Sequence, residues 1–327
     1  MKKEARRVTI RAPINKSPNN LNQESIQTPK HSHAGLILTI IVLAFAFMIC
    51  FFMLVSRSQT SNANIAVIPI NGMILSGSTN YYDGNTYSDD VSSITNNIIE
   101  NKNIKAVIFE INSPGGSAVG SSEVADSIKK LRDSGKLTIA LIREQGTSGA
   151  YLIATACDKI YTNPLAITGS IGVLASYLEY GDLLERFNIT YERLNAGQYK
   201  DTMSPYRELT DEERTILKSK INLIYEAFIR AVAENRNLSE ANVKELATGI
   251  FYLGSEAKQL GLIDELGSKQ DAISYIEQQL NIKSRVKDYS TNSFLSGLYG
   301  LQDRSFYMIG KGLGASIFNQ NNLNIQA

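Results

Sequence analysis

The sequence predicts an α/β fold with a mainly parallel sheet. Two apolar runs, residues 104–111 and 137–142, are each typical of a buried strand, and a Gly-containing turn and a helix-like pattern follow each of them. Strands that alternate with helices favour parallel pairing, because each parallel strand needs a crossover connection. With 327 residues, 43% of them hydrophobic, the chain is long enough for one large or two small domains with an ample core.

The composition narrows the possible functions. The net charge of +1 gives no indication of a nucleic-acid partner, and no metal cluster or nucleotide loop is visible, so we expect no cofactor. Cys50 and Cys157 are not expected to pair, so the fold needs no disulfide. His31 and His33 both precede the long apolar run, which excludes a Ser-His-Asp triad within the globular part of one chain. A nucleophilic Ser would therefore need Lys, a carboxylate or Tyr as its base.

The N-terminal region predicts a membrane anchor. Residues 1–33 are polar and basic and are expected to form a disordered cytoplasmic tail. Residues 34–55 carry no charge and would span roughly 33 Å as a helix, enough for the hydrocarbon core of a bilayer. Since only Arg57 closely follows this run, the positive-inside rule places the remainder of the chain across the membrane. The alternative is a cleaved signal peptide with small residues at 61–63, but the apolar run is too long for one.

After a polar linker at residues 56–64, strand and helix patterns alternate through residues 65–283. We expect strands at residues 65–70, 104–111, 137–142, 159–161 and 189–194. We expect helices at residues 91–100, from 117, at 150–156, at 210–234, from 239, at 254–260 and at 268–280, with an amphipathic run around 178–187. Thr210 and Glu213 form a capping-box pattern. Residues 284–327 are weakly patterned and are expected to form a C-terminal tail.

Ser148 stands between a predicted strand and a predicted helix, in the stretch Gln145-Gly-Thr-Ser-Gly-Ala150. A helix N-terminus presents free N–H groups and a dipole that favours negative charge, which suits a nucleophilic oxygen. The N–H of Gly149 would supply half of an oxyanion hole. The stretch resembles the G-x-S-x-G elbow of hydrolases, with Ala150 in the last position. The alternative is that Ser148 is only a helix N-cap, a position that Ser favours strongly.

A second turn, Asn112-Ser-Pro-Gly-Gly116, follows the strand predicted at residues 104–111. The paired Gly115 and Gly116 could present bare N–H groups to an anion, although a tight turn also recruits Pro and Gly. In parallel sheets, ligands bind at the carboxyl ends of the strands, and both turns lie at such ends. One edge of the sheet could therefore offer a nucleophile and two N–H donors.

Lys200 is the candidate for the base. Most other lysines lie in charged helix patterns that are typical of solvated faces, whereas Lys200 lies in a loop that also contains Gly197 and Tyr199. A lysine base must be neutral, so its pKa must fall by several units through desolvation. The residues alone leave this assignment open, because burial is not visible in a sequence.

Five motifs occur in order: Asn112-Ser-Pro-Gly-Gly116, Thr147-Ser-Gly-Ala150 followed by Ala156-Cys-Asp-Lys-Ile160, Thr168-Gly-Ser-Ile-Gly172, Gly197-Gln-Tyr-Lys-Asp201, and Met203-Ser-Pro205. Together they resemble signal peptide peptidase A (SppA) in its short, single-repeat bacterial form, over about residues 65–280. This resemblance implies a Clp protease/crotonase-like fold, a repeated ββα superhelix with a mainly parallel sheet. It also implies a homo-oligomeric ring in which the Ser and the Lys come from neighbouring subunits.

The same resemblance implies roles for single residues. Ser148 would be the nucleophile, Lys200 the general base, and Ser170 would hold the lysine amine by a hydrogen bond. The N–H groups of the Gly115-Gly116 turn and of Gly149 would form the oxyanion hole. Ala150 stands where many family members have Gly, a change that keeps the N–H.

The function expected from these observations is a membrane-anchored serine endopeptidase with a Ser-Lys dyad in residues 65–283. It would degrade cleaved signal peptides and other extended apolar peptides at the outer, periplasmic face of the inner membrane. One alternative is a non-catalytic, ring-forming membrane scaffold in which Ser148 only caps a helix. Another is a crotonase-like acyl-CoA enzyme that uses Glu or Asp, which a membrane anchor disfavours because CoA is cytoplasmic.

Overall fold

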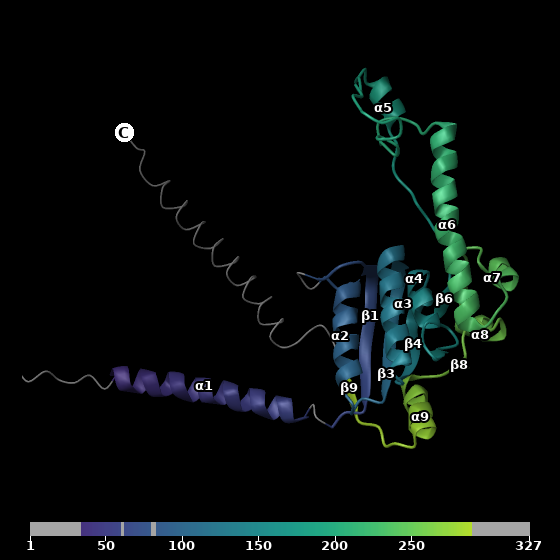
Figure 1. Ribbon diagram of the computed structural model, residues 1–327. Helices are drawn as coiled ribbons and strands as arrows, with labels where there is room; N and C mark the ends of the chain where they lie inside the picture. Colours follow the sequence, from purple (N-terminus) through teal and green to yellow (C-terminus); the bar gives the residue numbers. More distant parts are fainter. Residues whose placement is uncertain (1–33, 60–61, 80–82, 290–327) are drawn as a thin grey trace, which may run out of the picture. The chain divides into compact units, whose positions relative to one another are not determined.

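The computed structural model describes residues 34–59, 62–79 and 83–289 (Figure 1). The chain divides into two compact units, Met1–Arg57 and Ser58–Ala327. The predicted tail at 1–33 and residues 290–327 lie outside the described residues. Helix α1 (Ala34–Gln59) covers the predicted anchor and continues into the predicted linker. Across the ranges that the structure describes, no helix combines the length and the apolar character needed to cross a membrane.

The second unit is built on one sheet, in which nine strands are described. The strands are β1 (Ile65–Leu75), β2 (Thr86–Tyr87), β3 (Ala106–Gly116), β4 (Leu137–Thr147), β5 (Lys159–Thr162), β6 (Ile167–Gly169), β7 (Phe251–Leu253), β8 (Glu265–Leu266) and β9 (Val286–Asp288). Their order is β2-β1-β3-β4-β5-β8, with β6 beside β4 and β7, and β9 beside β1. The β6–β7 pair is antiparallel and the other described pairs are parallel. The predicted α/β fold with a mainly parallel sheet is confirmed.

The helices of this unit are α2 (Ser88–Glu100), α3 (Ala118–Asp133), α4 (Gly149–Thr155), α5 (Gly181–Arg186), α6 (Asp211–Arg236), α7 (Glu240–Leu246), α8 (Gly254–Gln259) and α9 (Lys269–Leu280). Helices α2, α3 and α4 connect the parallel strands β1, β3, β4 and β5 in turn, as crossover connections require. The predicted capping box of α6 is present: Glu213 N–H donates to Thr210 Oγ1 at 3.2 Å, and Thr210 N–H donates to Glu213 Oε2 at 2.9 Å.

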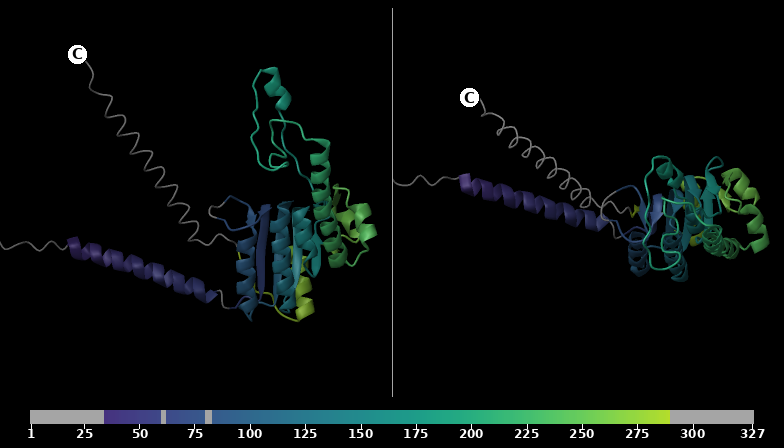
Figure 2. Two further views of the ribbon diagram at one scale, coloured as in Figure 1. Left: turned by 45° about the horizontal axis from the view of Figure 1, so that its top comes forward. Right: turned by 90° about the horizontal axis from the view of Figure 1, so that it is seen from above.

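Both faces of the sheet are covered, as the apolar strands require. Successive side chains of a strand point to opposite faces. In β3, Val107 and Phe109 therefore pack with α2, α3, α4 and α6, whereas Ala106 and Ile108 pack with α9. Figures 1 and 2 show α2 and α3 along one side of the sheet and α9 separate from them. Helices on both faces bury the central strands and hold in place the sheet edge at which β3 and β4 end.

Residues 173–210 form an extension that we call the arm; it leaves the body and returns at the start of α6 (Figures 1 and 2). The arm contains α5, and none of its residues, all of which the structure describes, is buried. The strand predicted at residues 189–194 is wrong: these residues have no sheet partner and are exposed. Their apolar–polar pattern suits a half-buried strand, but a strand needs a neighbour to pair with, and the arm offers none.

Both ends of the predicted domain at residues 65–283 also differ from the sequence analysis. Asn64, placed in the linker, is buried, and its side chain bonds the backbone of Lys283 and Arg285 at 2.9 and 2.7 Å. Strand β9, placed in the C-terminal tail, pairs with β1. Both segments belong to the body because their backbone groups complete one end of the sheet.

Candidate active site

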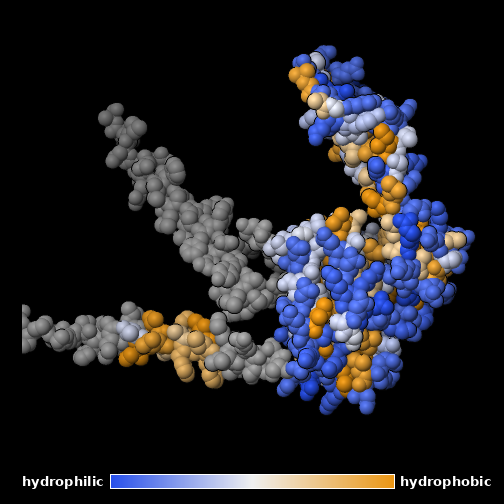
Figure 3. Space-filling model, in the orientation of Figure 1, coloured by the Kyte–Doolittle hydropathy of each residue, from blue (hydrophilic) through white to orange (hydrophobic). Residues whose placement is uncertain are grey.

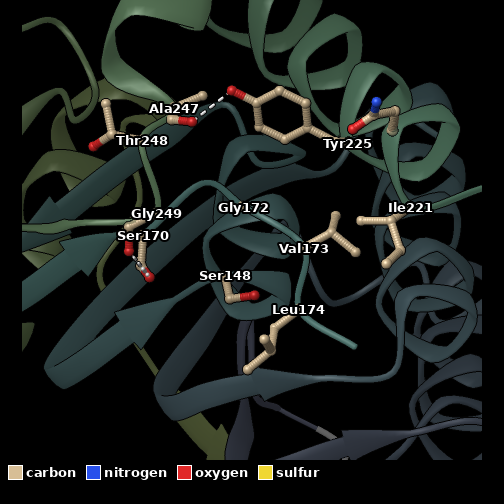
Figure 4. Close-up of a pocket in the computed structure, with 11 residues that line it drawn as sticks. Ser148, Ser170, Gly172, Val173, Leu174, Ile221, Tyr225, Ala247, Thr248 and Gly249 are labelled. Carbon is tan, nitrogen blue, oxygen red and sulfur yellow. Dashed lines mark hydrogen bonds between the residues drawn. The ribbon is translucent and has the colours of Figure 1, made fainter. Parts of the chain in front are cut away.

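Ser148 lies between β4 and α4, as the sequence predicts, but it does not act as a helix cap. It occupies the N-cap position with φ 54° and ψ −124°, and its side chain accepts no capping hydrogen bond from the described residues. A positive φ is strained for a residue other than glycine and often marks a functional site. The hydroxyl points into a cavity next to Val173 and Leu174 (Figure 4). The strained strand-to-helix turn resembles the G-x-S-x-G elbow of hydrolases, and the side chain makes no cap with the described residues.

The strained turn is held by backbone contacts on two sides. Ser148 N–H donates to Gly169 O at 2.8 Å, and Leu152 N–H donates to Ser148 O at 3.1 Å. On the other side, a Cβ on Gly115 would lie 2.8 Å from Gly149 N and 2.9 Å from Ser148 Cβ, closer than real Cβ atoms approach. Gly115 also has φ +99°, so both space and conformation require glycine there. The two predicted turns are therefore in direct contact.

Two N–H groups flank Ser148. Gly149 is the first residue of α4, and the position of a Cβ on Gly149 lies 3.4 Å from Gly116 N. The N–H of Gly115 already donates to Ser113 Oγ at 3.1 Å. Beyond it, Ser117 N–H donates to Ile74 O at 2.7 Å. Gly116 and Gly149 are therefore the better candidates for the oxyanion donors, and Gly115 shapes the turn.

Ser148 lies where two cavities meet. The α3–α6 cavity, about 580 Å³, runs between α3 and α6 and has mostly apolar walls that include Leu152, Ile224 and Phe228. The β6–α6 cavity, about 510 Å³, lies between Ser170 and Tyr225 (Figure 4). An extended peptide could place one side chain in the first cavity while its scissile carbonyl faces Ser148.

Ser170 lines the β6–α6 cavity together with Ser148. It has φ 51°, a second strained serine in this site. Its hydroxyl donates to Gly249 O at 2.9 Å, a bond drawn in Figure 4. The oxygen lone pairs of Ser170 therefore remain available to accept a hydrogen bond from an amine.

Lys200 lies elsewhere. It is exposed, it belongs to the arm, and it is not among the described residues that line either cavity. The structure thus brings together Ser148, Gly115, Gly116, Gly149 and Ser170 within one chain, but not Lys200.

Two residues to which the sequence analysis gave no role in the site, Ser113 and Tyr225, contribute to it. Ser113 holds the glycine turn, since its hydroxyl donates to Gly72 O at 2.6 Å while it accepts from Gly115. Tyr225 donates to Ala247 O at 2.6 Å and lines the β6–α6 cavity. Ser113 belongs to the motif Asn112-Ser-Pro-Gly-Gly116, in which the sequence analysis considered only the glycines. That motif was the sequence signal from which its role could have been predicted. Within the described ranges, no group of three or more His, Cys, Asp or Glu side chains is arranged to hold a metal ion.

Comparisons with known proteins identify the family of the chain. The family model described as peptidase family S49 matches residues 130–283. The chain is 33% identical to a putative protease of Methanocaldococcus jannaschii, over 71% of this chain and 74% of that protein. It is 32% identical to a putative signal peptide peptidase SppA of Enterococcus faecium, over 73% and 71% of the two chains. A solved structure of a ClpP1 variant from Listeria monocytogenes has a TM-score of 0.44 and 17% identity, over 67% of this chain and 98% of that one. The chain belongs to peptidase family S49.

Proposed function

We propose that the protein is a membrane-anchored serine endopeptidase that uses Ser148 as nucleophile and Lys200 as general base. The observation that carries the proposal is Ser148 itself. It is held at a positive φ, caps nothing among the described residues, and lies beside two N–H groups and two cavities. Relatives named as proteases and as SppA support peptidase activity.

In the proposed mechanism, neutral Lys200 takes the proton of Ser148 while Oγ attacks a peptide carbonyl. The N–H groups of Gly116 and Gly149 hold the oxyanion, each contributing about 3 kcal/mol to the transition state. The lysine then protonates the leaving amine, and a water molecule hydrolyses the acyl-enzyme. Ser170 accepts an N–H of the lysine amine, which leaves the nitrogen lone pair for the Ser148 proton.

We infer that Lys200 reaches Ser148 from a second copy of the chain. Ser148 and Lys200 are separated within one chain, and the arm exposes apolar side chains that a partner would cover (Figure 3). Leu174, Leu178 and Leu194 are 84–89% exposed, and Phe187 is 67% exposed. A ring of copies, each lending its arm to the next, would bury these side chains and complete each dyad.

The proposed substrates are cleaved signal peptides and other extended apolar peptides. The apolar walls of the α3–α6 cavity suit an apolar side chain, and the Ser148 edge is open to an extended chain. The proposed location is the outer face of the inner membrane. This part of the proposal rests on the sequence, in which the uncharged segment 34–55 is long enough for a bilayer and the basic segment 1–33 would lie in the cytoplasm. No helix among the described residues meets the criteria for a membrane span.

Intact mass spectrometry after exposure to a fluorophosphonate tests the proposal. The full-length protein should gain one adduct, located on Ser148 by peptide mapping, and the Lys200→Ala variant should gain none. An unlabelled protein that is assembled and folded would overturn the activated Ser-Lys pair and favour the scaffold alternative. An adduct of equal rate in Lys200→Ala would show that another group is the base.

A further inference from the structure

A partly buried ion-pair cluster lies directly beside Lys200, outside the cavities at Ser148. The guanidinium of Arg207 donates to both carboxylate oxygens of Asp201 at 2.9 and 3.0 Å. It also donates to both oxygens of Glu213 at 2.9 and 2.6 Å. One arginine thus holds two carboxylates by paired hydrogen bonds, the geometry in which arginine binds carboxylates most strongly. We call Asp201, Arg207 and Glu213 the Arg207 clamp.

The clamp fastens the Lys200 loop to the start of α6. Asp201 is the residue after Lys200, and Thr202 Oγ1 donates to Glu213 Oε1 at 3.0 Å. Glu213 belongs to the capping box of α6 and is only 3% exposed, in contrast to the open surface of the arm. The hydrogen bonds from Arg207 lower the pKa of Asp201 and of Glu213, so both carboxylates stay charged at neutral pH.

Helix α6 begins at the Arg207 clamp and extends into the body. Its far half buries Phe228, Ile229 and Val232 in the core that also contains α4. Its middle part, at Ile221 and Tyr225, lines the cavities at Ser148. The helix has 26 residues and is therefore about 39 Å long. One rigid element thus holds the Lys200 loop at one end and shapes the Ser148 site of the same chain at the other.

We propose that the Arg207 clamp is a positioning device that fixes the Lys200 loop on α6, so that the lysine is presented in register to Ser148 of a second copy. This inference rests on the proposed function, in which Lys200 acts across copies. The loop needs such a device because Lys200 is exposed and no residue of the arm is buried, so core packing does not fix the lysine. A misplacement of about 1 Å in a catalytic group can lower the rate roughly 100-fold.

The test uses full-length chains co-expressed in pairs and purified as assemblies. One chain carries Ser148→Ala and can donate only the lysine; the other carries Lys200→Ala and can donate only the serine. If the dyad is shared between neighbours, the unmodified pair should show about a quarter of wild-type peptidase activity, because only one neighbour pair in four is correctly matched. An inactive assembled pair would overturn the shared dyad and, with it, the clamp proposal.

Arg207→Ala is then added to one chain at a time. In the lysine donor it should lower the activity of the pair roughly 30- to 100-fold. In the serine donor it should change activity less than about twofold, because the lysine of that chain is already absent. Equal losses in both placements would show a structural role only, and no loss in either would show that the loop needs no clamp; both results overturn the proposal while leaving the shared dyad intact.

Two further variants keep the test decisive if Arg207→Ala disturbs folding. Asp201→Asn leaves the Arg207–Glu213 pair in place and should reduce activity in the lysine donor only. Lys244→Ala removes an exposed 2.8 Å ion pair between Lys244 of α7 and Glu226 of α6, and it should have no effect in either chain. If Asp201→Asn behaves like Lys244→Ala, the clamp does not position Lys200.

Discussion

The two halves of the proposed dyad lie in regions of opposite character. Ser148 is held in the body by β4, β6 and the glycine turn, between two well-covered faces of a sheet. Lys200 lies on an arm that has no buried residue and exposes leucine and phenylalanine side chains to solvent. Under the proposed function, the surroundings of Ser148 are complete in one chain, whereas Lys200 would act only where another copy covers the arm.

Under the proposed function, this contrast makes activity depend on assembly. An apolar side chain left in water forgoes about 1.5–3 kcal/mol that burial would provide, so several of them on one arm favour docking. A protease whose base arrives only with a partner remains inactive as a single chain. The predictions below test the body half, the arm half and the connection between them.

The largest expected effects come from removing either member of the dyad. Ser148→Ala and Lys200→Ala should each lower peptide hydrolysis by roughly 10⁴-fold or more, because members of a catalytic unit act together. Both variants should assemble and unfold like the parent. Hydrolysis rates together with the unfolding temperature check this, and activity within tenfold of the parent in either variant would remove that residue from the mechanism.

A smaller loss is expected when the oxyanion turn is crowded. A Cβ on Gly149 would lie 2.1 Å from Ser121 Oγ, so Gly149→Ala should displace its N–H and lower kcat by roughly 10- to 100-fold. Ser121 is buried, and its hydroxyl has no hydrogen-bond partner among the described residues. Ser121→Gly alone should therefore leave kcat nearly unchanged. Combined with Gly149→Ala, it should raise kcat at least fivefold above that of Gly149→Ala alone, where the single change has lowered kcat roughly 50-fold. Strict additivity of the two changes in a kinetic double-mutant cycle would refute the crowding account.

Changes on the arm should separate assembly from folding. Phe187→Asp combined with Leu194→Asp should reduce the oligomeric mass and lower activity by roughly 10-fold or more, because the buried interface loses two large apolar side chains. The unfolding temperature of the body should change little. Leu165→Asp is the matched control, since Leu165 is 79% exposed on the body. Unaltered mass and activity in the arm variant would show that the arm does not dock through these side chains.

The smallest predicted effect is a loosening of the arm in acid. The pKa values of Asp201 and Glu213 are lowered in the folded protein by hydrogen bonds from Arg207. Their contribution is therefore fully present above the unfolded pKa values, near pH 4, and is lost as the pH falls through the lower folded values. Hydrogen exchange of residues 198–202 should accelerate below about pH 4 in the parent, relative to the body. The same segment in Arg207→Ala should already exchange rapidly at neutral pH; slow exchange there would contradict the clamp.

The body half of the site could be predicted because its signals are local. Residues 104–111 and 137–142 form apolar runs, and each ends in a glycine turn whose place at the sheet edge follows from parallel pairing. The strained φ of Ser148 and the contact of Gly115 with Ser148 could not be predicted, since both depend on β6 and on the fit of two turns.

The arm was harder to predict, because its structure depends on the absence of a neighbouring strand. The alternation around Tyr191 suits a strand, yet no neighbouring strand is present to pair with it. The Arg207 clamp joins residues in a loop, a turn and a helix start, and charged residues in that arrangement have no periodic pattern. The short strands β2, β6, β7, β8 and β9 were missed for the same reason, since tertiary pairing alone defines segments of two or three residues.

The most direct test of the shared dyad is fluorophosphonate labelling of an assembly made from two inactive chains. Lys200→Ala carries Ser148 but no base, and Ser148→Ala carries the base but no nucleophile; mass separates the two. The account predicts no adduct on Lys200→Ala alone and an adduct on about half of its copies when it is assembled with Ser148→Ala in equal amounts. A mixed assembly that stays unlabelled, while the parent labels fully, would contradict a dyad shared between copies.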